Sequence, residues 1–354
     1  MKPLAGAGLA GIAALLLAAC GQAATSASQP PAAPASPPSA SAPAASGKPL
    51  EKIKVSFASD SAQYAPHFIA TDKGYYAAEG LDIEMVSAGG GIATPALISG
   101  DVAYSTSASS TIGAIIKGAP LKVIYTNVDR PGYELWTNSP DIKTIADVSG
   151  KSIGIQTRGD TFEVAMDIFL KQHGMDPSAV SYTPLGTGNQ RLAAIQSGSM
   201  QLALLGVADA VELQQAGANK ARKLADLKQD VQMLYTGVAT SDKELKDNAD
   251  RTKRFLRATM QGREYYKAFK EETLQIMNKY NKRSRTANEA DYDDVLSAMT
   301  RDGSMAPEFQ QADTEVRASL VNVSQPPPVS KLYDYSIVKR VYSDLQASGW
   351  RPQR

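Results

Sequence analysis

The fold is decided by a run of elements that opens with Lys54-Val55-Ser56-Phe57-Ala58, closes with Val102-Ala103-Tyr104-Ser105 and recurs about 98 positions later. Between these two stretches, the first pass of the repeat contains a predicted helix, a segment in which apolar and acidic residues alternate, a glycine triplet and a second predicted helix that ends at Ser99-Gly100. The second pass follows the same order from Ser152-Ile153-Gly154-Ile155-Gln156 to Met200-Gln201-Leu202-Ala203. Two similar α/β lobes in one chain imply a cleft between them, and such clefts bind ligands.

Residue patterns inside each pass indicate strands that alternate with helices. Leu81, Ile83 and Met85 alternate with acidic residues, which is typical of a half-buried strand. In the second pass an amphipathic helix begins at a predicted capping box of Asp160 and Glu163. This alternation predicts parallel sheets, in which ligands meet the carboxyl ends of strands and the amino ends of helices.

Residues 1–19 are typical of a signal peptide, with Lys2 as the single basic residue before an apolar stretch. The apolar stretch is too short to span a bilayer as a stable helix. It ends in Leu17-Ala18-Ala19-Cys20, which resembles the bacterial lipoprotein box, in which the cysteine is lipidated and the peptide is cut before it. An ordinary secretory signal with a chance cysteine is the alternative. Since Cys20 is the only cysteine of the sequence, we expect neither a disulfide nor a thiol nucleophile.

The lipidated cysteine begins a predicted tether over residues 20–48, composed almost entirely of Ala, Pro and Ser. Such a segment has no large apolar side chains to bury, so we expect it to be disordered. The sequence has 37 basic and 36 acidic residues, which does not favour binding to nucleic acid or anionic lipid. The basic runs 251–254 and 279–283 are interpreted as solvated helix faces.

Several motifs resemble one family. Residues 73–84, Lys-Gly-Tyr-Tyr-Ala-Ala-Glu-Gly-Leu-Asp-Ile-Glu, resemble the "KGYFAEEGLDVE" signature of type II periplasmic substrate-binding proteins. The branch is the one that serves uptake of aliphatic sulfonates, taurine, nitrate and thiamine pyrimidine precursors. Residues 118–124 resemble the "GAPLKVV" strand of this family. Residues 145–154 resemble its "ADLKGKKIGV" segment, with which the chain of the family begins the second lobe. Residues 255–259 extend the similarity into the C-terminal part.

The resemblance implies an α/β fold of two similar Rossmann-like lobes joined by two hinge crossings. We expect lobe 1 to comprise residues 49–136 and 238–354, and lobe 2 to comprise residues 137–237. The crossings are expected near residues 133–136 and 234–238.

The repeat and the resemblance together place a ligand on loops that follow strands and face each other across the cleft. The residues predicted to line it from lobe 1 are Ser61, Gln63, Tyr64, Gly90, Gly91, Thr106, Ser107 and Ser109. Those predicted from lobe 2 are Thr157, Arg158, Asp160, Thr161, Gly188, Asn189 and Asp209.

Two features of this set bear on the charge of the ligand. Glycines at a helix start present backbone amides, which favours an anionic group, although glycine triplets also occur as plain loops. The guanidinium of Arg158 is suited to bidentate contact with a sulfonate, carboxylate or phosphate. The equal alternative is a surface arginine paired with Asp160 or Glu163. Tyr64, Tyr133 and Trp136 are candidates for stacking on a planar ligand or for hinge packing.

The predicted function is that of a non-catalytic receptor, without cofactor or metal, which delivers a small anionic or heterocyclic molecule to an ABC permease and its ATPase. We expect a monomer in the cell envelope of a bacterium, with its domain in the periplasm or extracytoplasmic space, held to a membrane only by its lipid and not bound to nucleic acid. Alternatives are an enzyme of the same fold, from a pyrimidine-precursor or quinone pathway, and a ligand-sensing partner of a signalling receptor. The enzymes rely on histidines, whereas His67 and His173 here are explained by helix packing and a helix end.

Overall fold

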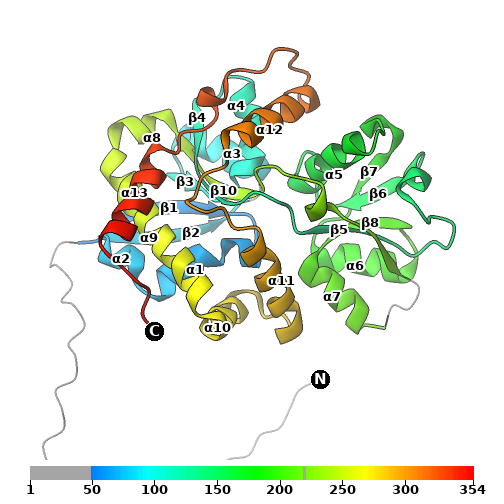
Figure 1. The fold of residues 1–354 in the computed structure, drawn as a ribbon, viewed down its shortest axis with the longest axis horizontal. Coiled ribbons are helices and arrows are strands. Elements are labelled where there is room, and N and C mark those ends of the chain that lie inside the picture. Colours follow the sequence, from blue (N-terminus) through cyan, green and yellow to red (C-terminus); the bar gives the residue numbers. More distant parts are fainter. Residues whose placement is uncertain (1–48, 89, 218–220) are drawn as a thin grey trace, which may run out of the picture. The chain divides into compact units, whose positions relative to one another are not determined.

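Two five-stranded sheets with helices packed on them form the described part of the chain (Figure 1). The computed structural model describes residues 49–88, 90–217 and 221–354. The predicted signal peptide 1–19, the lipidation site Cys20 and the tether 20–48 lie outside the described residues. Within the described ranges, every helix is too short or too polar to cross a membrane.

The two sheets have the same topology. The first has the order β2-β1-β3-β10-β4, formed by β1 Glu51–Phe57, β2 Leu81–Ser87, β3 Tyr104–Ser105, β4 Leu121–Val128 and β10 Thr236–Ser241. The second has the order β7-β6-β8-β5-β9, formed by β5 Tyr133–Thr137, β6 Ser152–Ile155, β7 Ser181–Pro184, β8 Leu202–Gly206 and β9 Arg222–Asp226. In each sheet the three repeated strands are parallel, and a strand next to a crossing, β10 or β5, runs antiparallel to them. The predicted α/β fold of two similar lobes is confirmed.

The helices of each lobe follow the strands as the repeat predicts. Lobe 1 carries α1 Ala65–Asp72, α2 Tyr75–Ala78, α3 Gly90–Ser99 and α4 Ala108–Ile116. Lobe 2 carries α5 Thr161–Gln172, α6 Gly188–Ser197 and α7 Val207–Gln215. The C-terminal part returns to lobe 1 with α8 Asp242–Asp247, α9 Ala249–Ala268, α10 Lys270–Asn281, α11 Arg285–Ser297, α12 Pro307–Leu320 and α13 Ser336–Ala347.

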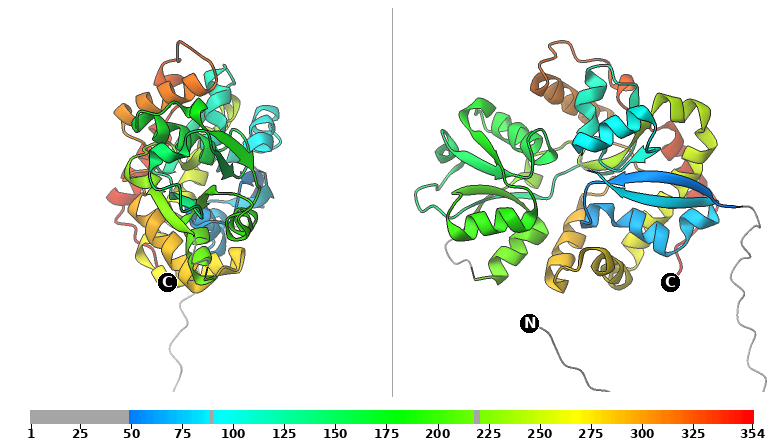
Figure 2. Two further views of the ribbon diagram at one scale, coloured as in Figure 1. Left: turned by 90° about the vertical axis from the view of Figure 1, so that its right-hand side faces the viewer. Right: turned by 180° about the vertical axis from the view of Figure 1, so that it is seen from behind.

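The two passages between the lobes lie at residues 129–132 and 230–235, because these residues separate strands of different sheets (Figure 2, right). The first passage precedes the position expected from the sequence, since Tyr133–Thr137 is already a strand of the second sheet. The second passage is hydrogen-bonded to the first and to the end of β4: the N–H groups of Met233 and Tyr235 donate to the carbonyl oxygens of Asp129 and Val128 at 3.0 and 3.1 Å, respectively. This pairing makes the passages a two-segment hinge.

The amino-terminal end of α1 is held in place by close packing against α9. A side chain at Gly262 of α9 would overlap the carbonyl oxygen of Pro66, so only glycine permits this approach. His67 is buried on the same helix, and its Nδ1 lies 2.9 Å from the hydroxyl of Tyr76. Burial lowers the pKa of His67 to about 3, so the ring is a neutral core residue. This packing positions the 3₁₀ turn Ala62–Tyr64, which immediately precedes α1 and carries predicted site residues.

Candidate functional site

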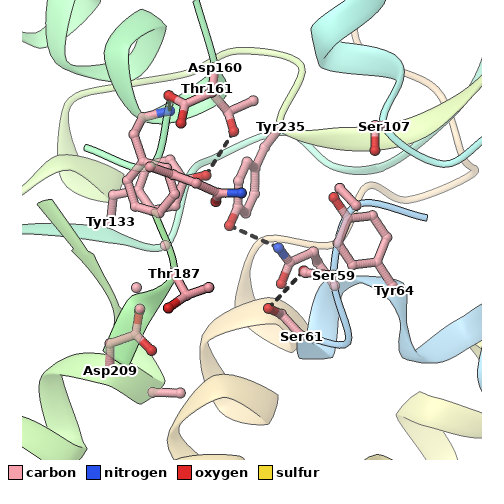
Figure 3. Close-up of a pocket in the computed structure, with 18 of the residues that line it drawn as sticks. Ser59, Ser61, Tyr64, Ser107, Tyr133, Asp160, Thr161, Thr187, Asp209 and Tyr235 are labelled. Carbon is pink, nitrogen blue, oxygen red and sulfur yellow. Dashed lines mark hydrogen bonds between the residues drawn. The ribbon is translucent and has the colours of Figure 1, made fainter. Parts of the chain in front are cut away.

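A cavity of about 590 Å³ lies between the lobes and is lined by residues from both (Figure 3). Its walls come from the loops after β1 and β6, the amino-terminal ends of α4, α5, α6 and α7, the hinge, and one side of α11. The equivalent loops of the two repeats therefore face one another, as expected for two parallel sheets whose strand ends meet at a cleft.

Most of the predicted site residues line this cavity. They are Ser61, Gln63, Tyr64, Ser107, Ser109, Thr157, Arg158, Asp160, Thr161, Gly188 and Asp209. Gly90 and Gly91 begin α3, whose next residue, Ile92, also lines the cavity. The structure thus brings together loops that are up to about 150 positions apart in the sequence, from Ser61 to Asp209.

Two predicted residues, Thr106 and Asn189, lie elsewhere. Thr106 is buried, and its hydroxyl donates to the carbonyl oxygen of Ser56 at 3.1 Å, whereas its neighbour Ser107 faces the cavity. Side chains of an extended segment alternate in direction, which separates the two. Asn189 is exposed on α6, because a helix turns about 100° per residue and Gly188 already occupies the cavity side.

The loop before α5 is held by its own side chains. Asp160 caps the helix by accepting from the N–H groups of Phe162 and Glu163 at 2.9 and 3.1 Å. Glu163 does not complete the predicted capping box at Asp160 and instead accepts from the N–H of Gly159 at 2.7 Å. Arg158 is 58% exposed in its side chain and pairs with Glu163 at 2.9 Å. The ion pair between Arg158 and Glu163, which was the alternative to ligand binding by Arg158, is therefore present at the rim of the cavity.

Asp209 joins the two lobes through its carboxylate. Its Oδ2 accepts from Nη2 of Arg191 in the same lobe at 3.2 Å, and its Oδ1 accepts from Nη1 of Arg283 in the other lobe at 2.8 Å. Gly188 makes room for this group, because a side chain there would overlap the carboxylate of Asp209. Glu212 adds a second, longer contact to Arg283 at 3.6 Å. The Asp209 carboxylate raises the pKa of Arg283 in spite of partial burial, so this arginine is positively charged.

Arg191, Arg283 and the residues of α11 are cavity-lining groups that the sequence reasoning did not find. Arg283 falls in the basic run 279–283, for which the sequence predicts a solvated helix face; the structure corrects this for Arg283, which is bound to Asp209. Arg191 follows Gly188 by three positions, so helical periodicity would have placed it on the cavity side. Asp291 and Asp294 come from a helix outside the repeat, and nothing in the repeat points to them.

Four aromatic rings line the cavity near the hinge. Tyr133 stacks on Phe162 with ring centres 3.8 Å apart, and Tyr235 meets Tyr133 edge-on at 5.1 Å. Tyr64 stands across the cavity in lobe 1, with Tyr235 between it and Tyr133 (Figure 3). Burial raises the pKa of Tyr64 to about 12, so its hydroxyl stays protonated. Tyr133 thus lies at the start of β5, directly after the first passage, and forms part of the cavity wall.

The charged groups of the site are carboxylates and guanidinium groups. Asp291 accepts one hydrogen bond, from the N–H of Ala62 at 2.9 Å, and burial raises its pKa to about 6. In the described ranges the lining includes no histidine, cysteine or lysine, and no group of three or more candidate ligands is placed to hold a metal ion. The cavity can therefore bind through stacking, hydroxyl groups and charge.

Comparisons with known proteins agree with this architecture. A family model described as NMT1/THI5 like matches residues 61–273. The riboflavin-binding protein RibY of Chloroflexus aurantiacus is 27% identical over 212 residues, which cover 56% of this chain and only 58% of that protein. The periplasmic aliphatic sulphonate binding protein SsuA of Escherichia coli superposes with a TM-score of 0.65 at 17% identity, covering 79% of this chain and 91% of SsuA. The periplasmic nitrate-binding protein NrtA of Synechocystis PCC 6803 gives a TM-score of 0.63 at 17% identity, with 84% and 90% covered.

Proposed function

Since the chain belongs to the NMT1/THI5-like family and has the fold of periplasmic binding proteins, we propose that it is an extracytoplasmic solute receptor. It captures a small organic molecule between its lobes and delivers it to an ABC permease and the associated ATPase. The relatives named for riboflavin, sulphonate and nitrate binding support the receptor role, since each is named for a small solute.

The observation that carries this proposal is the cavity between two lobes, between which the chain passes twice through hydrogen-bonded segments. Residues of both lobes line it, so a ligand held there stabilises the closed arrangement by contacting both walls. Closure is what would distinguish the loaded receptor from the empty one at the permease.

Delivery at a membrane requires the domain to remain close to it. Lipidation of Cys20 and a tether over 20–48 would hold the domain on the extracytoplasmic side, and this part of the proposal rests on the sequence motif. The receptor is proposed to act as a monomer. An enzyme is less well supported, because His67 is a neutral core residue and His173 is bound to the end of α5 through the carbonyl oxygen of Phe169 at 2.9 Å.

The test is small-angle scattering of the purified protein with and without a saturating ligand. Riboflavin is the first probe, followed by whatever molecule mass spectrometry finds in the protein as purified. A tight ligand is expected to lower the radius of gyration and to raise Tm by mass action. An unchanged radius of gyration with a ligand of micromolar affinity would rule out hinge closure.

A further inference from the structure

Asp209 places a carboxylate between two arginines at the wall of the cavity (Figure 3). Its Oδ2 accepts from Nη2 of Arg191 at 3.2 Å, and its Oδ1 accepts from Nη1 of Arg283 at 2.8 Å. Arg191 belongs to lobe 2, whereas Arg283 precedes α11 in lobe 1. Each lobe thus binds one oxygen, and a free carboxylate, sulfate or phosphate ion would bridge two guanidinium groups in the same way.

Arg191 is held in place by groups other than Asp209. Its Nε donates to the carbonyl oxygen of Leu204 at 2.9 Å, and its Nη1 donates to that of Gly186 at 2.7 Å. The guanidinium also lies over the ring of Phe162, 4.3 Å from its centre. Burial lowers the pKa of Arg191, and the Asp209 carboxylate opposes this effect. Without Asp209 the guanidinium would keep its position, and its buried charge would lack a partner.

The space around the carboxylate fits a group of this size closely. Gly188 begins α6, and a side chain there would overlap both carboxylate oxygens of Asp209. A Cβ at Gly206, just before α7, would lie 3.6 Å from Oδ2. Together with Arg191 these glycines form a recess in lobe 2, and Arg283 covers it from lobe 1. Removal of the carboxylate would leave room for an anion of similar size.

We propose that Asp209 is a built-in counter-ion that occupies an anion site of the cavity and thereby determines specificity. With Asp209 in place, the pair Arg191 and Arg283 is closed to small anions; without it, the pair binds a carboxylate or sulfate ion. Rejection of a ligand by a group of the protein itself is a common means of specificity. The anionic ligand expected from the sequence meets neutralised arginines here, as it does at Arg158, which Glu163 neutralises. This deepens the receptor function proposed above and rests on it for the entry of a ligand into this cavity.

The experiment is calorimetric titration of the variant Asp209→Ala and of the unaltered protein with formate, acetate and sulfate. The variant is expected to bind formate or acetate about tenfold or more tightly than the unaltered protein, because the ion restores charge-assisted hydrogen bonds to both arginines. Binding should also raise the Tm of the variant and lower its radius of gyration, since the two arginines come from different lobes. Equal binding by both proteins, or no binding by the folded variant, would overturn the proposal.

Two further variants separate the site from the effect of net charge. Asp293→Ala removes one negative charge from an exposed position, where Asp293 pairs with Lys270 at 2.7 Å, and should bind the anions no better than the unaltered protein. Asp209→Asn leaves an amide of similar volume in the recess, so it too should bind them no better. Enhanced binding by either variant would show that the anion does not occupy the recess, which contradicts the proposal.

The variant Asp209→Ala remains informative even if it does not fold in a buffer without these ions. Formate, acetate or sulfate is then expected to restore cooperative urea unfolding, because the ion replaces the missing counter-charge of Arg191. Failure of all three ions to do so would overturn the proposal. None of these measurements uses the natural ligand, so such a failure leaves the receptor function to its own scattering test.

Discussion

At the scale of the residue, Asp291 is a charge whose burial costs stability. Its carboxylate is enclosed by α11 and the turn at Ala62, and the charged groups that act on it are Arg283, Asp294 and Asp209. Burial is the largest cause of its raised pKa, and Arg283 opposes that rise only in part. Titratable groups whose pKa is strongly shifted by burial are concentrated at functional sites.

Asp291→Asn should therefore stabilise the ligand-free protein. A rise of the pKa from 3.8 to about 6 means that ionisation costs up to about 3 kcal/mol once the pH exceeds 6. The folded state binds the proton more tightly than the unfolded state, so the cost vanishes as the pH falls below 4. Urea unfolding should show a gain of about 1–3 kcal/mol for the variant at pH 8 and almost none at pH 4. A gain independent of pH would contradict this account.

At the scale of the element, α12 ties the cavity wall to the hinge through Arg317. This arginine is 4% exposed; its Nε donates to Asp313 at 2.8 Å, and its Nη2 donates to the hydroxyl of Ser109 at 2.8 Å and to the carbonyl oxygen of Leu234 at 2.9 Å. Ser109 lines the cavity, and Leu234 belongs to the second passage. One planar guanidinium thus fixes three segments at once, which a lysine cannot do.

Arg317→Lys is expected to loosen the hinge more than it destabilises the fold. Loss of one or two charge-assisted hydrogen bonds at about 1.5–3 kcal/mol each should speed amide exchange at residues 107–110 and 230–235 by about tenfold or more. Arg263→Lys is the control: Arg263 is equally buried in lobe 1 but donates to the carbonyl oxygen of Arg301, away from the cavity. If Arg317→Lys and Arg263→Lys speed amide exchange equally at residues 107–110 and 230–235, Arg317 does not hold the hinge through its own hydrogen bonds.

At the scale of the whole molecule, the lobes touch on both sides of the hinge. On one side α11 lies beside α7, with Arg283 bound to Asp209; on the other α12 lies beside α5, where Nζ of Lys171 donates to the hydroxyl of Ser319 at 2.8 Å (Figure 1). These polar contacts favour the closed arrangement, and a ligand bound between the lobes would stabilise it further. The Arg283 pair is the stronger of the two, because both partners are charged and largely shielded from water.

Arg283→Gln should shift the ligand-free protein towards an open arrangement. Loss of about 1–2 kcal/mol from the closed state changes the ratio of closed to open molecules by a factor of about 5–30. Scattering should show a larger radius of gyration than for the unaltered protein. Arg285→Gln is the control, because Arg285 is exposed and pairs with Glu271 within lobe 1 at 2.7 Å. An unchanged radius in Arg283→Gln would mean that this ion pair does not govern opening.

Much of the fold and part of the site could be predicted because they depend on local patterns. The alternation at 81–86, the glycines that end helices and the repeat led to the strands and helices as observed. Loops after equivalent strands could be assigned to the cleft, which is why Ser61 and Thr157 were placed there. The prediction was wrong where it depended on the direction of a single side chain: Thr106 and Asn189 are one position away from residues that face the cavity.

Periodicity and glycine positions act over a few residues, so they were sufficient to predict the two lobes and the loops that face each other. The electrostatics of the cavity depend instead on tertiary contacts. The charge that a ligand meets depends on which arginine is neutralised by which carboxylate, and Asp209 and Arg283 are 74 positions apart. Such pairs form when lobes and the returning C-terminal helices pack together, and ion-pair strength depends on burial that no local pattern records. The repeat therefore predicted where a ligand lies, and the packing decided which charges it meets there.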